Sequence, residues 1–283
     1  MQNEFEISLS YGNLRGIEFG QGNPRKVLAV HGWLDNAASF THLAPLLNDS
    51  HVVAVDLPGH GLSDHRAPGS AYHLLDYLPT LVELVHKLGW QSYVAMGHSL
   101  GAGICSLLAA TQHTSIESLI LIDGVGPVAE SADKLPDRLT RSIQRHSQLK
   151  TKRLPVYKDL GAALKMRLDV TTMNPSSAEL IVQRNLQEVE NGVTWRTDRR
   201  VTLASPAYLM EEQVEVLLRS IRCPGILIQA GDGVLTERKT TTSRVACIDN
   251  IQCVQLPGNH HFHLDTPELV ATPINRFLVS AAL

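Results

Sequence analysis

Met96-Gly97-His98-Ser99-Leu100-Gly101 is the stretch of this sequence that decides the fold. It follows the apolar run Tyr93-Val94-Ala95, which predicts the end of a buried strand, and it precedes an apolar, small-residue segment at 102–110, which predicts a helix. A G-x-S-x-G pattern between a strand and a helix is typical of a nucleophile elbow, a turn so tight that only small residues fit two positions to either side of the serine. Ser99 then stands at a helix N-terminus, where unpaired N–H groups favour an anion.

Short apolar runs alternate with helical segments on both sides of this motif. The expected strands are 26–30, 52–55, 93–95, 119–122, 226–229 and 251–256, preceded by a hairpin of alternating strands at 5–9 and 14–19 around Gly12-Asn13. The expected helices are 39–47, 72–88, 102–110 and one that opens at Thr266-Pro267-Glu268. This alternation predicts an α/β fold with a mostly parallel sheet and helices on both faces. Such sheets bind ligands beyond the C-terminal ends of their strands, which is where His31, Ser99 and Asp123 fall.

The alternation of short apolar runs with helical segments is absent between residues 127 and 208. This segment is helical in pattern and richer in charge, and it lies between two expected sheet strands. We therefore expect a helical cap at 127–208 laid over the strand ends, with a core formed by 1–126 and 209–283. A length of 283 residues suits one α/β domain with such an insertion.

A basic stripe crosses the expected cap. Its members are Arg138, Arg141 and Arg145 at helical spacing, flanked by Lys134, Lys150, Lys152 and Arg153. A solvated helix face is the simpler interpretation, and attraction of an acidic substrate or partner is the alternative. The candidates for an apolar acyl pocket are Met166, Met173, Tyr208 and Met210, although methionine at such places is more often ordinary core.

The composition of the chain indicates which partners and which cellular compartment to expect. The net charge of −3 gives no indication of a nucleic-acid partner or of an anionic membrane surface. The start of the chain has neither a basic nor an apolar region of the kind that signal peptides use, and no apolar run reaches membrane-spanning length. Four cysteines without C-x-x-C spacing favour reduced thiols. We therefore expect a cytoplasmic protein without a membrane or nucleic-acid partner, whose oligomeric state stays open.

Four motifs in order resemble those of the α/β-hydrolases, and among them the serine hydrolase-like branch, over nearly the whole chain. They are His31-Gly32-Trp33-Leu34-Asp35-Asn36, Asp56-Leu57-Pro58-Gly59-His60-Gly61, Gly97-His98-Ser99-Leu100-Gly101 and Gly258-Asn259-His260-His261. The resemblance implies the α/β-hydrolase fold, with the cap inserted after the strand that follows the elbow helix. It implies no dissociable cofactor, and it implies a catalytic triad with Ser99 as the nucleophile.

A serine hydroxyl needs a base that removes its proton during attack. The resemblance implies His260 as this base, because the family's histidine follows a glycine-plus-one pattern after the last strand, which Gly258-Asn259-His260 matches. His261 and His263 are the competitors. Three histidines so close together raise the question of a metal, but their spacing matches no zinc motif and we expect none. We expect a structural role for His98.

The acid of the triad has two candidates, because the order Ser, Asp or Glu, His is satisfied by both Asp123 and Asp232. The family's common location follows the strand at 226–229 and, by its usual spacing, falls on Gly233, one residue after Asp232. Asp123 directly follows the strand at 119–122, an alternative strand end that some relatives use, and we favour it. The simpler interpretations are a turn residue for Asp232 and a turn acceptor for Asp123.

The resemblance further implies an oxyanion hole formed by the backbone N–H groups of Trp33 and Leu100. The expected function is a serine hydrolase that cleaves small-molecule carboxylic esters of short to medium acyl chains through an acyl-enzyme. A serine at position 99 argues against a haloalkane dehalogenase or an epoxide hydrolase, whose chemistry needs a carboxylate there. The alternatives are a cofactor-free perhydrolase, a C–C bond hydrolase, and a ligand sensor that keeps the triad but turns over little.

Overall fold

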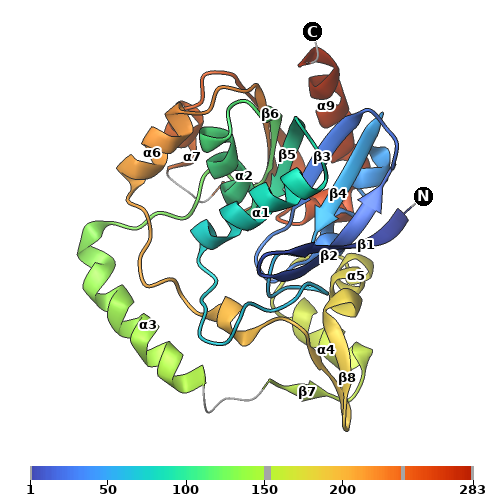
Figure 1. Cartoon of the computed structure of the whole chain (residues 1–283), viewed down its shortest axis with the longest axis vertical. Coiled ribbons are helices and arrows are strands. Elements are labelled where there is room, and N and C mark those ends of the chain that lie inside the picture. The colour runs from blue at the N-terminus through green and yellow to red at the C-terminus, as the bar shows by residue number, and fades with distance from the viewer. Residues whose placement is uncertain (1, 150–153, 237–239, 282–283) are drawn as a thin grey trace.

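The computed structural model describes residues 2–149, 154–236 and 240–281. Its strands within one large sheet are β1 (Gln2–Leu9), β2 (Gly12–Phe19), β3 (Arg25–Val30), β4 (Ser50–Val55), β5 (Tyr93–His98), β6 (Ile116–Ile122), β10 (Gly225–Asp232) and β11 (Ile251–Asn259). They lie in the order β1-β2-β4-β3-β5-β6-β10-β11. Figure 1 labels the strands of this sheet from β1 to β6. The pairs β1–β2 and β2–β4 are antiparallel, and all pairs from β4 to β11 are parallel. The expected mostly parallel sheet is confirmed.

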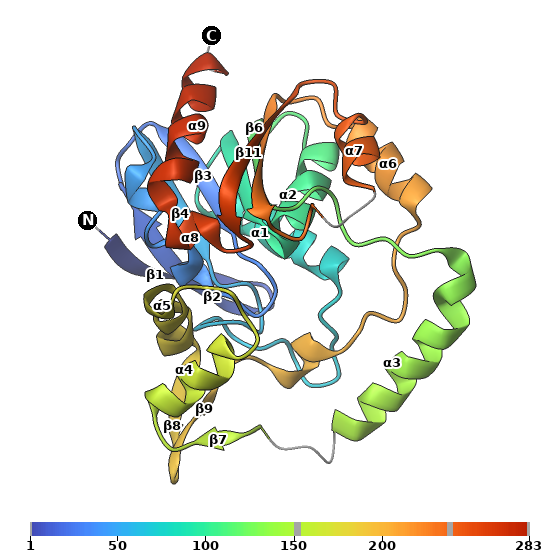
Figure 2. The same cartoon turned by 180° about the vertical axis from the view of Figure 1, so that it is seen from behind.

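Helices cover both faces of this sheet. They are α1 (Tyr77–Lys87), α2 (Leu100–Thr111), α6 (Glu211–Arg219), α7 (Thr241–Val245), α8 (Phe262–Asp265) and α9 (Pro267–Ser280). Neighbouring residues of a central strand alternate between two cores. In β5, Ala95 faces a core shared with α1, α2 and α6, whereas Met96 faces a core shared with α9. Figure 2 shows α9 on the side of the sheet opposite α1 and α2, so the central strands are buried from both sides.

Two expected elements differ from the prediction at the N-terminal side. The helix expected at 39–47 is replaced by two 3-10 turns, η1 (Ala37–Phe40) and η2 (Ala44–Leu46). Pro45 lies in the middle of the expected helix and cannot donate a backbone hydrogen bond, which disfavours one continuous helix. The hairpin is confirmed, but its strands pair at Leu9 and Gly12, so the turn lies at Ser10-Tyr11, before Gly12-Asn13.

The segment between β6 and β10 lies outside the large sheet. Its elements are η4 (Ala132–Lys134), α3 (Leu135–Leu149), β7 (Val156–Tyr157), α4 (Leu160–Leu168), α5 (Pro175–Asn185), β8 (Leu186–Val189), β9 (Gly192–Trp195) and η5 (Arg199–Thr202). The expected cap helices are present, and α3 stands apart from the sheet in both views (Figures 1 and 2). Three of the flanking basic residues, Lys150, Lys152 and Arg153, lie outside the described residues.

The cap also contains a small antiparallel sheet in the order β7-β9-β8, which the helical pattern did not predict. β8 and β9 form a tight hairpin in which Val189 pairs with Gly192. Asn191 has a φ of 73° and Gly192 a φ of 144°, conformations that Asn and Gly adopt at low cost. The dipeptide Asn191-Gly192 was therefore the sequence signal for this hairpin.

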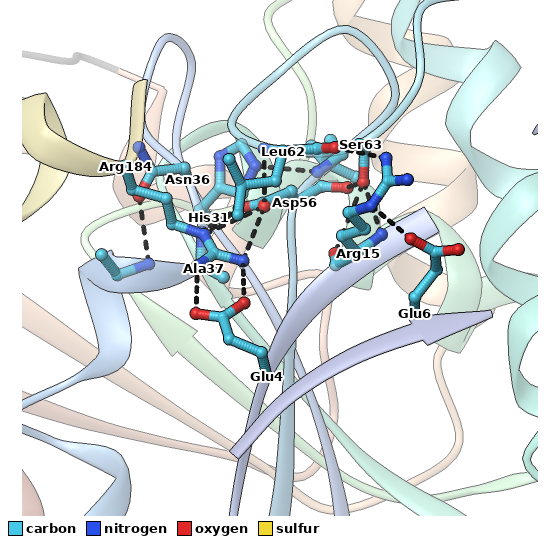
Figure 3. A network of polar contacts seen from close by, with 12 residues as sticks. Glu4, Glu6, Arg15, His31, Asn36, Ala37, Asp56, Leu62, Ser63 and Arg184 are labelled. Carbon is cyan, nitrogen blue, oxygen red and sulfur yellow. Dashed lines mark hydrogen bonds and ion pairs between the residues drawn. The ribbon is translucent and has the colours of Figure 1, made fainter. Parts of the chain in front are cut away.

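A buried ion pair joins the cap to the core (Figure 3). Arg184 of α5 contacts Asp56, which directly follows β4, and the same guanidinium contacts Glu4 of β1. The Asp56 carboxylate also accepts hydrogen bonds from the backbone N–H groups of Ala37 (2.7 Å) and Leu62 (2.9 Å). One carboxylate thus fixes the cap and two core loops around the ends of the sheet strands. Across the described ranges, no helix has the length and apolar composition needed to cross a bilayer.

Candidate active site

Ser99 lies in the tight turn between β5 and α2. Its φ of 52° and ψ of −112° form a backbone conformation that non-glycine residues rarely adopt. A Cβ atom on Gly97 would lie 2.3 Å from the carbonyl oxygen of Gly101, and one on Gly101 would lie 1.9 Å from that of Val30. Larger residues are therefore excluded at both glycine positions, which explains the G-x-S-x-G spacing.

His260 and Asp123 come from different strand ends and meet side by side. His260 directly follows β11, Asp123 directly follows β6, and His260 Nδ1 lies 2.5 Å from Asp123 Oδ2. The fully buried carboxylate also accepts hydrogen bonds from the backbone N–H groups of Val234 (3.0 Å) and Ala230 (3.4 Å). Because an ionised carboxylate only accepts, Nδ1 carries the proton and Nε2 keeps a free lone pair.

Asp232, the other candidate acid, lies apart from this pair. It is the exposed last residue of β10, and its side chain makes no hydrogen bond or ion pair within the described part of the chain. A Cβ atom on the next residue, Gly233, would lie 2.3 Å and 2.6 Å from the two carboxylate oxygens of Asp123. The carboxylate of Asp123 therefore fills the space that a side chain at position 233 would enter.

His98 links the elbow to His260. The two imidazole rings have centroids 4.6 Å apart, and His98 Nε2 donates to the backbone carbonyl oxygen of His260 at 2.8 Å. Burial lowers the pKa of His98 well below its usual value, so the ring is neutral. His98 directly precedes Ser99 in the chain. With Nε2 protonated, its ring therefore holds the backbone of His260 beside the elbow.

The two rival histidines contact other partners. His261 Nε2 lies 3.2 Å from Asp35 Oδ2, and His263 Nε2 lies 2.8 Å from Ser39 Oγ. Burial lowers the pKa of His263 to about 3. Neither ring contacts the carboxylate of Asp123. His260, which does, differs from both in this respect.

Asp35, His98 and His261 are the described residues that best fit a metal ion, since their ligand atoms lie within 4.8 Å of one another and all three are buried. The Asp35 carboxylate already has a cationic partner, because Arg167 of α4 lies 2.5 Å from its other oxygen. Its charge is thus balanced by protein groups. Sequence reasoning missed Asp35 and Arg167, because their contact depends on how the cap lies against the loop after β3.

Trp33 and Leu100, the expected oxyanion-hole residues, both line the same cavity as Ser99. Neither backbone N–H donates a hydrogen bond to an acceptor among the described residues. The loop that carries Trp33 is braced by His31, whose Nε2 accepts from the N–H of Leu57 at 3.0 Å and whose Nδ1 donates to the carbonyl of Gly32 at 2.7 Å. Burial lowers the pKa of His31 to about 4, which keeps it in this neutral form.

The cavity at Ser99 has a volume of about 730 Å³ and is lined mainly by apolar residues. Of the four expected pocket residues, Tyr208 lines it. The other three do not: Met166 is 48% exposed, Met173 is buried in a cap cluster, and Met210 borders a separate cavity of about 310 Å³. The loop after η5 and the segment before α1 supply the apolar lining instead. Residues 72–76 belong to the helix expected at 72–88, but α1 begins at Tyr77 and the 3-10 turn η3 (Leu74–Asp76) precedes it.

Comparisons with known proteins agree with this architecture. A family model described as alpha/beta hydrolase fold matches residues 26–196. The chain is 40% identical to a hypothetical protein of Pseudomonas aeruginosa PAO1 with a solved structure, over 99% of this chain and 98% of that one, with a TM-score of 0.91. A "Serine hydrolase-like protein" of Danio rerio is 30% identical over 97% of this chain and 88% of its own length.

A solved thioesterase domain from the curacin biosynthetic pathway is 25% identical, with a TM-score of 0.83, over 97% of this chain and 99% of that one. The family match covers more than half of the chain, and the P. aeruginosa structure and the D. rerio relative extend the similarity to almost all of it. The chain therefore belongs to the α/β-hydrolase fold family and is similar to proteins described as serine hydrolase-like.

Proposed function

We propose that this protein is a serine hydrolase that cleaves carboxylic esters of short to medium acyl chains through an acyl-enzyme. The observation that carries the proposal is the contact between His260 Nδ1 and the buried Asp123 carboxylate, held against the elbow by His98. Ser99 stands in that elbow at the N-terminus of α2 and lines a cavity of substrate size.

In the proposed reaction, Ser99 Oγ attacks the ester carbonyl carbon while His260 Nε2 removes the hydroxyl proton. His260 then donates that proton to the departing alcohol, and an acyl group remains on Ser99. A water molecule, deprotonated by the same Nε2, attacks the acyl carbon and releases the carboxylic acid. Asp123 holds the Nδ1–H and stabilises the imidazolium that forms in both halves.

The backbone N–H groups of Trp33 and Leu100 are the proposed donors to the oxyanion. Each such donor contributes about 3–4 kcal/mol to lowering the barrier in serine hydrolases. Among the described residues, Ser99 Oγ has no hydrogen-bond partner, and catalytic hydrogen bonds of this kind commonly tighten only when substrate binds.

The proposed substrate is a small-molecule ester. A cavity of about 730 Å³ with a mostly apolar lining suits a short or medium acyl chain. Thioesters are a second candidate class, because a thioesterase domain is similar over nearly the whole chain and thioesters are cleaved by the same acyl-transfer chemistry.

A fluorophosphonate probe followed by peptide mapping tests the nucleophile. We expect labelling at Ser99 in the wild type and none in Ser99→Ala, where alanine fits the elbow and removes only the hydroxyl. A series of p-nitrophenyl esters from two to sixteen carbons, run beside matched acyl thioesters, tests the substrate class. Labelling at another serine, binding without product release, or activity that rises steeply with emulsified long-chain lipid would contradict the proposal.

A further inference from the structure

The three arginines of the basic stripe on α3 lie in three different environments. The Arg138 guanidinium pairs with Glu130 and lies 3.9 Å from the ring centre of Tyr208. Arg141 donates from Nε to the carbonyl oxygen of Asp137 in its own helix, at 3.3 Å, and does not line the cavity. Arg145 lines the cavity that contains Ser99, and its side chain has no hydrogen-bond or ion-pair partner within the described residues. The three arginines of the stripe therefore differ in their contacts.

Helix α3 is held in place at the positions that precede Arg145. Arg138 is anchored by its ion pair and by the face of Tyr208, and Tyr208 itself lines the cavity. One turn later, Ser142 is 4% exposed and its hydroxyl lies 3.4 Å from the carbonyl oxygen of Ala204, another lining residue. Because Arg145 follows Ser142 by three positions, it lies on the same side of the helix. The anchored helix therefore holds the exposed Arg145 beside the cavity.

The Asp and His side chains that line this cavity already have partners. Asp76 accepts a hydrogen bond from the backbone N–H of His73 at 2.9 Å, and His73 Nδ1 lies 3.3 Å from Ser205 Oγ. Asp123 is paired with His260. Arg145 is thus the cationic side chain of the described lining that is left without an anion, in a cavity whose other lining is mainly apolar.

We propose that Arg145 binds an anionic group, a carboxylate or a phosphate, carried by the ester that Ser99 cleaves. A guanidinium presents several N–H donors in a planar fork that matches both anions, and hydrogen bonds between charged groups are stronger than those between neutral ones. The proposal rests on the proposed ester hydrolysis and narrows its substrate class to esters of acidic molecules. The anion is carried either by the acyl part or by the alcohol part of the substrate.

Two pairs of esters distinguish these sources. p-Nitrophenyl hydrogen adipate against p-nitrophenyl methyl adipate tests an anion on the acyl side, and 1-butyrylglycerol 3-phosphate against 1-butyrylglycerol tests one on the alcohol side. In at least one pair, we expect the wild type to have a higher kcat/KM for the anionic ester. Arg145→Gln should lower the ratio of anionic to neutral kcat/KM about two- to fivefold, mainly through KM, because an exposed charge pair contributes about 1 kcal/mol at most. Arg145→Lys should keep part of it.

Arg141→Gln is the matched control, because it removes an arginine from the same exposed helix without touching the cavity lining. It should leave the ratio unchanged. The ratio in the wild type should also fall as salt is raised, since an exposed charge pair is screened. A ratio that is the same in the wild type and in Arg145→Gln for both pairs, or that falls equally in Arg141→Gln, overturns the proposal.

A binding measurement separates this proposal from the hydrolysis itself. In Ser99→Ala, calorimetry with methyl hydrogen adipate, dimethyl adipate and 1-butyrylglycerol 3-phosphate reports recognition without turnover. Tighter binding of an anionic compound that is lost in Ser99→Ala/Arg145→Gln supports the anion site even if no ester is hydrolysed. Binding that does not depend on the charge of the compound or on Arg145 overturns it, even if esters are hydrolysed.

Discussion

The Nε atom of Arg184 lies 3.0 Å from both carboxylate oxygens of Asp56, across 128 positions of the chain. Both side chains are buried, with 7% of Arg184 and 0% of Asp56 exposed. The outer nitrogens of the same guanidinium contact Glu4 at 2.6 Å and 2.9 Å (Figure 3). A buried pair of this kind costs desolvation energy, so its main consequence appears when one partner is removed.

We predict that Arg184→Met destabilises the protein by about 3–5 kcal/mol, because it leaves the Asp56 carboxylate buried without its cation. Chemical unfolding monitored by circular dichroism measures this loss. Glu4→Gln is the control, since Glu4 is 58% exposed and pairs with the solvent side of the guanidinium. It should cost about 1 kcal/mol at most. Equal losses of unfolding free energy in the two variants would contradict the prediction that loss of the cation beside buried Asp56 is the more costly change.

The free energy of unfolding should decrease as the pH is lowered from 6.5, at pH values where carboxylates of ordinary pKa are still ionised. Burial lowers the pKa of His31 to about 4 and the pKa values of His60 and His263 to about 3. In the unfolded chain these groups take up protons near pH 6.5. The folded state therefore keeps its full stability above pH 6.5 and loses it as the pH falls toward 4, by up to about 3 kcal/mol for each histidine. Free energies of unfolding at pH 7.5, 6 and 5 measure this slope.

His60→Leu provides the control for that slope. His60 Nε2 is buried without a hydrogen-bond partner in the described part of the chain, and Nδ1 lies 3.3 Å from the carbonyl oxygen of Pro58. Leucine therefore removes a titrating group at the cost of one buried hydrogen bond, which is the same at every pH tested. The stability of this variant should depend less steeply on pH between 6.5 and 5 than that of the wild type. A wild-type stability that is flat or increases toward pH 5 would contradict the buried neutral state of these rings.

The sequence predicted the sheet well, because the constraints on a parallel strand are local. Apolar runs such as 119–122 and 226–229 become strands that helices cover on both faces. The elbow was equally accessible, because Gly97 and Gly101 are required by close approach of the backbone alone. The hairpin at Asn191-Gly192 carried a turn signal, but the surrounding helical pattern outweighed it.

Contacts that depend on how the cap lies on the core could not be predicted in this way. No local pattern connects Asp35 with Arg167 or Asp56 with Arg184, since each pair joins a core loop to a cap helix. The pocket candidates show the same limit. Met166 and Met173 were selected by residue type, whereas much of the cavity lining comes from 72–76, which contains the 3-10 turn η3, and from 201–209, which begins at the end of η5.

The two neighbouring histidines should differ sharply in their effect on activity. His260→Ala should lower kcat by several orders of magnitude, because it removes the ring that contacts Asp123. His261→Ala should lower kcat far less, because that ring contacts Asp35. Steady-state kinetics on one p-nitrophenyl ester compares them. If the two variants exchange places, the base is His261.

The two candidate acids should differ in the same way. Asp123→Asn keeps the shape of the side chain but favours the wrong imidazole tautomer, so we expect a loss of about 10⁴-fold in kcat. Asp232→Asn should keep most of the activity, because Asp232 is exposed and its side chain makes no hydrogen bond or ion pair within the described residues. Kinetics on the same ester test both variants. A severe loss in Asp232→Asn would place the acid on β10.

The last prediction moves the carboxylate that contacts His260 from one strand end to the other. A side chain at position 233 is excluded because its Cβ atom would lie 2.3 Å from Asp123 Oδ2. Gly233→Asp alone should therefore lower both stability and activity. Asp123→Gly frees that space and also suits the φ of 43° at this position. The double variant Asp123→Gly/Gly233→Asp should be more active than Asp123→Gly.

Recovery should be partial, because the new Cβ atom would still lie 2.7 Å from the Cβ atom of Ala230, which has to shift. The measurement is kcat on a p-nitrophenyl ester for the two single variants and the double variant, with melting temperatures to confirm folding. Asp123→Gly/Gly233→Asn is the matched control, since it places the same atoms at position 233 without the charge. Equal activity of the Asp and Asn double variants would show that a carboxylate at 233 does not replace the one at 123, and would contradict the prediction.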